Sequence, residues 1–129
     1  MRDRALVSSG SPLEPEIGFS RAVRSGPHIF VAGTAPIPRP GMVAPTGLYD
    51  QTRLCLEIIE KAVADAGGSL QHVTRTRIML TDMSGWREAA RAHGEYFSSI
   101  RPACTFVEVS GFIDPGWLVE IEADAVVPE

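Results

Sequence analysis

Hydrophobic positions recur along this chain with two periods, which predict different elements. The helical period is clearest over Tyr49–Ala66, where apolar residues recur three or four positions apart and charged residues take the opposite side. We expect Thr46 or Asp50 to cap this helix, and Gly67-Gly68 to end it, because glycine tolerates a positive φ. The apolar stripe is Cys55, Ile58, Ile59, Ala62, Val63 and Ala66.

A second helix is predicted from Ser84, as its cap, to about Ser99. Its apolar stripe is Trp86, Ala89, Ala90, His93, Tyr96 and Phe97. Because His93 lies on this stripe, we expect a half-buried histidine rather than a catalytic base.

Alternating or β-branched runs predict strands, and segments rich in Pro and Gly predict loops. The strands are residues 4–9, 20–24, 28–34, 72–81, 103–110 and 118–127, and the loops are 11–18, 35–47 and 111–116. The order β-β-β-α-β-α-β-β contains two β-α-β crossovers, which place both helices on one face of a mixed sheet. We therefore predict one α+β domain spanning residues 1–129.

Composition narrows the function. The 129 residues suffice for one domain, and the net charge of −4 disfavours nucleic acid or an anionic membrane as a partner. Two cysteines outside any metal-binding spacing suggest a reduced, cytoplasmic protein. The chain has no long apolar run, no nucleotide-binding or zinc motif, and no sign of a cofactor.

Three carboxylates, Glu120, Glu122 and Asp124, alternate along the last predicted strand and therefore share one face. That face is either solvated or lined with arginines from elsewhere, or it presents one acid as a general acid/base. The spacing does not choose among the three acids. Cys104 begins the preceding strand, and by default it is a small buried hydrophobe. His28 and His72 flank strand starts and are expected at the surface.

Several short runs, in this order, resemble the Rid family (RidA, YjgF, UK114). Residues 17–23, Ile-Gly-Phe-Ser-Arg-Ala-Val, are similar to the family's Gly-Pro-Tyr-Ser-Gln-Ala-Val. Residues 29–36 resemble its Val-Phe-Val-Ser-Gly-Gln-Ile-Pro strand. The match continues with Leu80-Thr-Asp-Met, Glu95-Tyr-Phe, Arg101-Pro-Ala and Val119-Glu-Ile-Glu-Ala.

This resemblance implies a chorismate-mutase-like α+β fold of the bacillary type. It also implies a homotrimer, in which three sheets form a central barrel and ligand clefts lie between subunits. In the family's imine deaminases, an arginine clamps the substrate carboxylate and a glutamate works with a water molecule.

Carried over to this chain, most of the family's pocket positions are changed. Glu120 matches the glutamate, but Cys104 stands where the clamping arginine is expected. Arginine binds a carboxylate through a charged, planar fork that cysteine lacks, so small anionic imines are disfavoured. Other replacements are Phe19 for Tyr, Ala32 for Ser, Ala90 for Asn and Phe106 for Cys. They make the cleft apolar, where the pKa of Glu120 is expected to rise.

The first hypothesis is a cofactor-independent enamine or imine deaminase of altered specificity. Glu120 would position water and shuttle protons, Phe19, Phe106 and Trp117 would shape the pocket, and His93 or Cys104 would assist. Because deaminases of 2-aminomuconate belong to this superfamily, a substrate of aromatic-ring degradation fits. The alternative is a non-catalytic trimer that binds a metabolite or a protein in the same clefts. A ribonuclease is disfavoured by the charge.

Overall fold

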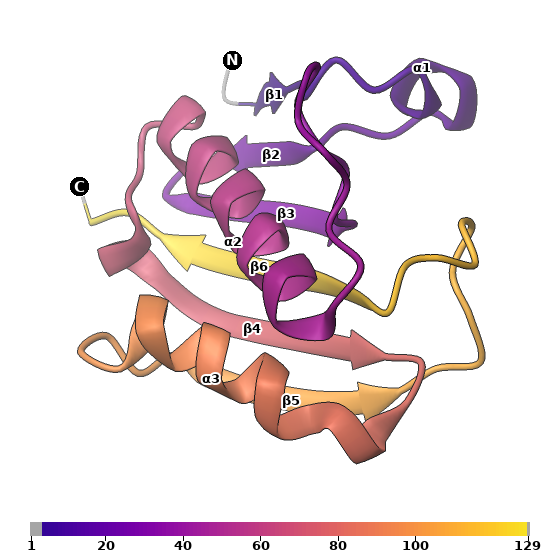
Figure 1. Ribbon diagram of the computed structural model, residues 1–129. Helices are drawn as coiled ribbons and strands as arrows, with labels where there is room; N and C mark the ends of the chain where they lie inside the picture. The colour runs from indigo at the N-terminus through magenta and orange to yellow at the C-terminus, as the bar shows by residue number, and fades with distance from the viewer. Residues whose placement is uncertain (1–3, 129) are drawn as a thin grey trace.

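The computed structural model describes residues 4–128, and these build a six-stranded sheet with two long helices on one face (Figure 1). The strand order is β1-β2-β3-β6-β4-β5. The strands are β1 (Arg4–Val7), β2 (Ala22–Ser25), β3 (His28–Thr34), β4 (Val73–Leu80), β5 (Ala103–Glu108) and β6 (Val119–Val126). The helices are α1 (Leu13–Ile17), α2 (Leu48–Asp65) and α3 (Trp86–Phe97).

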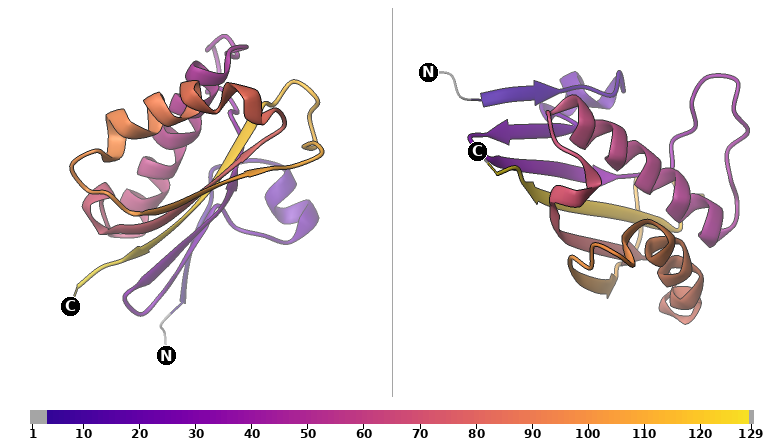
Figure 2. Two further views of the ribbon diagram at one scale, coloured as in Figure 1. Left: turned by 90° about the horizontal axis from the view of Figure 1, so that it is seen from below. Right: turned by 90° about the vertical axis from the view of Figure 1, so that its left-hand side faces the viewer.

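The sheet is mixed, as predicted. Strands β1, β2 and β3 form an antiparallel meander, and β6 inserts between β3 and β4, antiparallel to both. Strands β4 and β5 run parallel and are connected through α3. Figure 2 shows α2 and α3 side by side over the same face of the sheet, so this part of the prediction is confirmed.

The alternation along β6 decides which residues enter the core. Its buried residues point toward the helices, and its three acids point to the opposite face, here called the open face. The buried residues are Val119, Ile121, Ala123 and Ala125.

The helix stripes are confirmed in α2 and only in part in α3. In α2, Cys55, Ile59, Ala62 and Val63 are buried, and Leu54 and Leu56 join them. In α3, the fully buried residues are Ala89, Ala92 and Phe97. The placement of Trp86 on a buried stripe is wrong, because its ring lies at the helix start and is 37% exposed.

Helix α1 was not predicted, because the Pro, Glu and Gly content of residues 11–18 suggests a loop. Pro12 and Pro15 fit the start of a helix, since backbone N–H groups in the first turn have no intrahelical partner. Gly18 ends α1 in the left-handed conformation, with φ 95°. The short helix brings Glu14 and Phe19 close to the sheet, as described below.

The predicted caps of the two long helices are also wrong. Gly47 is the N-cap of α2 and makes no side-chain hydrogen bond. Before α3, a single 3₁₀ turn at Met83–Gly85 delays the start of the helix. Asp82 caps this turn by accepting hydrogen bonds from the backbone N–H and the hydroxyl of Ser84. Ser84 is therefore a donor to the cap rather than the cap itself.

The open face carries a group of exposed apolar side chains. Leu6 and Phe30 are 63% and 51% exposed, and both flank Val23 across the strand pairs. Val126 lies on the same face of β6 and is 38% exposed. Contiguous apolar surface of this kind is typical of a contact with another molecule.

The predicted end of α2 is confirmed. Gly67 has φ 92°, and the backbone N–H of Gly68 donates to the carbonyl of Val63 at 2.9 Å. Arg24 Nη1 donates to the carbonyl of Ala66 at 2.9 Å, and a Cβ on Gly67 would lie only 2.7 Å from the same nitrogen. The positive φ therefore favours glycine here, whereas the flexible end of Arg24 can move away from an added Cβ.

Gly67→Ala should lower the free energy of unfolding by about 1–2 kcal/mol, because alanine is strained at a left-handed φ. Gly94 in α3 is the matched control, since it has open space around it and no positive φ. Gly94→Ala should raise the free energy of unfolding by about 0.5–1 kcal/mol. Urea denaturation measures both, and equal effects at the two glycines would contradict this account.

Candidate functional site

A hollow of about 590 Å³ lies on the open face between α1 and strands β1–β3, here called the β2–β3 hollow. Phe19 and Ala32, two of the predicted site residues, both line it. Its wall is mostly apolar, with charge only from Arg4 and Glu14. The apolar lining residues include Leu6, Phe19, Val23, Phe30, Val31 and Ala32.

Local structure places both predicted residues in the wall. The left-handed Gly18 turns the chain after α1, and the backbone N–H of Phe19 then donates to the carbonyl of Glu14 at 2.9 Å. The backbone N–H of Ala32 donates to the carbonyl of Arg21 at 3.0 Å, which extends the β2–β3 pairing to the hollow.

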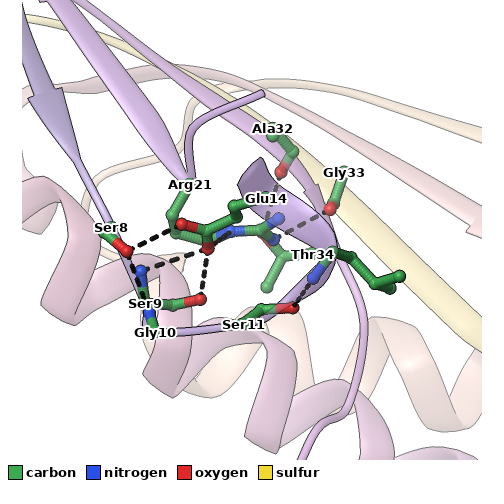
Figure 3. Close-up of polar contacts among 10 residues, drawn as sticks. Ser8, Ser9, Gly10, Ser11, Glu14, Arg21, Ala32, Gly33 and Thr34 are labelled. Carbon is green, nitrogen blue, oxygen red and sulfur yellow. Dashed lines mark hydrogen bonds and ion pairs between the residues drawn. The ribbon is translucent and has the colours of Figure 1, made fainter. Parts of the chain in front are cut away.

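A buried polar cluster reaches the hollow through Glu14 (Figure 3). Glu14 is only 4% exposed and accepts hydrogen bonds from the hydroxyls of Ser8 and Ser9, at 2.8 and 2.5 Å. It also accepts from the backbone N–H of Ser9 at 3.1 Å. Its Oε2 lies 4.0 Å from Nε of Arg21, which is 8% exposed. The carboxylate is thus nearly saturated by donors from the segment after β1.

The pKa of Glu14 reflects this environment. Burial acts to raise it, but hydrogen bonds from Ser9 and Ser8 outweigh burial, and the charge of Arg21 adds to them. The pKa of Glu14 therefore lies below its ordinary value, and the carboxylate is ionised at neutral pH.

Glu120, the proposed acid/base residue, is half-buried at the start of β6. Its carboxylate lies against Gly33 of β3, where an added Cβ would come within 3.0 Å of Oε1. Burial raises the pKa of Glu120, the positive charge of Arg21 opposes this, and the charge of Glu122 reinforces it. The expected rise in the pKa of Glu120 is therefore confirmed.

The other two acids of β6 have arginine partners on β4. Arg77 Nη1 is paired with Glu122, and Arg75 Nε lies 3.9 Å from Asp124. The arginine-lined alternative therefore holds for these two acids. Glu120 has the uncharged Met79 opposite it on β4, so strand pairing gives it no such partner.

The remaining predicted site residues lie away from the β2–β3 hollow. Cys104 and Phe106 pair with Thr76 and Ile78, which places them on the helix-covered side of β5. The expectation that Cys104 is buried is wrong: it is exposed, because β5 is the edge strand and has a neighbour on one side only. The ring of Phe106 packs edge-on against Trp86, with centroids 6.2 Å apart.

His93 is held between α3 and β4, as expected for a half-buried histidine. Its Nε2 lies 2.9 Å from the hydroxyl of Thr76, and its ring tilts against Phe97. Burial lowers the pKa of His93, so the ring is neutral at pH 7. Ala90 of α3 and Trp117 of the loop before β6 are half-buried and do not line the β2–β3 hollow. Of the two remaining histidines, His28 is exposed and His72 is half-buried.

Among the described residues, Phe19 and Ala32 therefore line the same hollow, and Glu120 lies against Gly33, the residue that follows Ala32. Sequence reasoning missed the two buried charged residues beside them, Glu14 and Arg21. Glu14 was hidden in a segment predicted to be a loop. One feature of the sequence could have pointed to Arg21: it stands where the family's opening run has Gln.

Within residues 4–128, no group of three or more His, Cys, Asp or Glu side chains is arranged to hold a metal ion. No helix among the described residues is long and apolar enough to span a membrane.

The mixed sheet, the helix layer on one of its faces and the apolar hollow on the other define a small α+β protein. The model of the family described as Endoribonuclease L-PSP matches residues 9–127. The chain belongs to this family, whose members are also called YjgF, RutC or Rid proteins, and the resemblance seen in its motifs is confirmed.

Similar proteins agree on the fold. A crystal structure of a YjgF/YER057c/UK114 family member from Mycobacterium tuberculosis is 48% identical and superimposes with a TM-score of 0.89, covering 96% of this chain and 99% of that one. The chorismate-mutase-like α+β fold class is thereby confirmed. An uncharacterised Streptomyces coelicolor protein is 38% identical over 119 residues, 92% of this chain and 89% of its own length. The 3-aminoacrylate deaminase RutC of Acinetobacter baylyi is 32% identical over 128 residues, 98% of this chain and 100% of RutC.

Glu14→Gln should destabilise the protein by about 1–3 kcal/mol at pH 7, because it leaves buried donors without an anionic acceptor. Since the folded-state pKa of Glu14 is lowered, its contribution to stability is present above the ordinary value of 4.5 and is lost as pH falls through the lowered value. Urea unfolding at pH 7 and below pH 4 should therefore show a difference from wild type that shrinks on acidification.

Glu16 is the matched control, because it lies in the same helix but is exposed. Glu16→Gln should leave stability nearly unchanged at both pH values. A Glu14→Gln effect that does not depend on pH would contradict the ionised, hydrogen-bonded state described here.

Proposed function

We propose that this protein is a Rid-type deaminase that hydrolyses an enamine or imine and releases ammonia, with a substrate preference different from that of 3-aminoacrylate deaminases. The observation that carries the proposal is Glu120, a half-buried acid with a raised pKa that lies against Gly33, the residue that follows Ala32 of the apolar hollow. The relationship to RutC supports the reaction class.

The chemistry needs one group that can both accept and donate a proton. An enamine first gains a proton at carbon and loses one from nitrogen, and so becomes an imine. Water then adds to the C=N carbon: Glu120 accepts a proton from the water, and the nitrogen takes a proton as the C=N double bond becomes a single bond. The C–N bond then breaks when Glu120 returns a proton to the nitrogen and the new hydroxyl group loses its proton, so the products are a carbonyl compound and ammonia. A carboxyl group whose pKa is raised toward neutral pH suits both directions of proton transfer.

We propose that the complete site forms between subunits of a homotrimer. Phe19 and Ala32 lie near one edge of the sheet, whereas Cys104 and Phe106 lie on β5 at the other edge. A cleft containing both groups therefore requires two chains. The exposed Leu6, Phe30 and Val126 on the open face support assembly, since a neighbouring sheet would cover them.

The substrate we propose is bulkier and less anionic than 3-aminoacrylate. The hollow is lined mainly by apolar side chains, and Cys104 supplies no charge where an arginine clamp is expected. A carboxylate that lost its arginine partner would lose a charge-assisted, bidentate hydrogen bond. Phe19 and Phe106 would instead favour apolar or aromatic groups.

A second candidate function is a non-catalytic trimer that binds a metabolite or a protein in the same clefts. The observation that favours it is the exposed Cys104 at the position of the clamp, because a binding protein could lose that arginine without penalty. We do not propose a ribonuclease. The net charge is −4, and Arg75 and Arg77, which could face RNA from β4, are paired with acids.

Glu120→Gln should lower the enzyme-dependent rate of ammonia release by about 100-fold or more, because the group that transfers protons is removed. The assay follows ammonia from imines generated in situ, after subtraction of spontaneous hydrolysis. Glu122→Gln is the matched control on the same strand face, since Arg77 already holds the Glu122 carboxylate. It should keep most of the activity.

Two imine substrates that differ by one carboxylate should distinguish the deaminase from the binding protein. Imines made from phenethylamine by an amine oxidase and from phenylalanine by an amino-acid oxidase differ only by the carboxylate. We expect the wild type to accelerate hydrolysis of the imine without carboxylate at least as well as the other. Unchanged activity of Glu120→Gln would remove Glu120 from the mechanism, and wild-type protein that binds the products but accelerates no imine would favour the binding function.

A further inference from the structure

Arg21 is the buried charged residue that the proposed mechanism leaves without a task. It lies just before β2, and only 8% of its surface is exposed. Its Nη1 donates to the carbonyl of Gly33 at 2.9 Å and to the hydroxyl of Thr34 at 3.1 Å. Its Nε is buried and has no hydrogen-bond partner among the described residues, with Glu14 Oε2 still 4.0 Å away. Burying a guanidinium that has an unpaired donor costs folding free energy. A role in the site would account for keeping such a group.

The two acceptors of Nη1 lie where the pairing of β3 with β6 is irregular. The register shifts between Val31 and Thr34, and the hydroxyl of Thr34 donates to the carbonyl of Ala32 at 2.8 Å. Irregularities of this kind bend a strand and change the direction of its neighbours. Arg21 thus anchors the irregular segment of β3 by its backbone as well as by a side chain.

The irregular segment is also where Glu120 lies. Gly33 presents no side chain to Glu120, and a Cβ there would be 3.0 Å from Oε1. The anchor at the Gly33 carbonyl therefore holds a bare backbone surface against the carboxylate. Phe19, which lines the hollow, has its ring centroid 5.3 Å from the Arg21 Cζ, so Arg21 supports the aromatic wall as well.

Arg21 is the positively charged group that acts on Glu120, since the other titratable groups described next are acidic, neutral or paired with another acid. On β6, the neighbouring acid Glu122 is itself paired with Arg77 of β4. From α2, the buried Cys55 faces this region as a neutral thiol, because burial raises its pKa. From α1, Glu14 acts through Arg21 and brings a negative charge.

We propose that Arg21 is a positioning residue of the site: it braces the irregular segment of β3 against Glu120 and supplies a positive charge that acts on the Glu120 carboxyl group. The inference rests on the proposed function, because it takes Glu120 as the acid/base group. The family's opening run has Gln at this position, and an amide can donate hydrogen bonds but carries no charge. Arg21 therefore brings a positive charge to Glu120 from the start of β2. On β5, Cys104 stands where the resemblance places an arginine.

The test is a carboxyl-carbon NMR titration of Glu120 in the ligand-free protein. With Arg21→Gln, burial and Glu122 act without opposition, so the titration midpoint of Glu120 should rise by about half a pH unit or more. Arg21→Lys keeps a charge on a different stem and should leave the midpoint near that of the wild type. Arg24→Gln is the matched control, because Arg24 lies in β2 but donates to Ala66 at the end of α2. It should not move the midpoint.

A second measurement does not require any Arg21 variant to fold. In the wild type, the Nε–H signal of Arg21 should respond in two steps, at low pH with Glu14 and at higher pH with Glu120. Glu120→Gln should remove the higher step only. An unmoved Glu120 midpoint in folded Arg21→Gln, an equal shift in Arg24→Gln, or a wild-type Nε–H signal without the higher step would each overturn the inference.

These titrations need no substrate, so the two proposals can fail separately. If the protein releases no ammonia but the titration midpoint of Glu120 depends on Arg21, the deaminase proposal fails and the role of Arg21 stands. If the protein is an active deaminase and the Glu120 midpoint does not depend on Arg21, the role of Arg21 fails and the deaminase proposal stands.

Discussion

The structure depends on the alternation of side chains along β6. This strand lies between β3 and β4, so each of its residues must suit both neighbours and one of two environments. Val119, Ile121, Ala123 and Ala125 fill the core beneath α2, and a shift of one residue would bury three carboxylates there instead. Since ionised groups cannot be buried without partners, the register of β6 cannot shift by an odd number of residues.

The three acids on the open face have two kinds of environment. Glu122 and Asp124 are neutralised by the arginines of β4, which lie directly opposite in the antiparallel register. Glu120 is opposite Met79 and meets the irregular part of β3. The same strand therefore carries two acids with structural partners and one acid whose environment raises its pKa. That difference is the reason why we propose a chemical role for Glu120 and structural roles for Glu122 and Asp124.

The relationship to the Rid family explains the fold, and on our proposal the residues around Glu120 differ from those of the family's imine deaminases. The resemblance implies that Cys104, Phe19 and Ala32 stand where the family's imine deaminases have more polar or charged groups. Meanwhile Glu14 and Arg21 bury an ion pair on the other side of the hollow. On our proposal, the site therefore differs from that of the family's imine deaminases in electrostatics rather than in architecture.

The sequence by itself determined the two long helices, the strand order along the chain, the alternation of β6 and the family, because these depend on periodicity and on local motifs. It did not reveal α1, the true caps, or the exposure of Cys104 and Trp86. Those follow from where a segment lies relative to the sheet edge, which no local pattern records. Only the tertiary structure brought Arg21 and Gly33 to Glu120, about a hundred residues apart in sequence, because the electrostatics of a carboxyl group depend on neighbours in space.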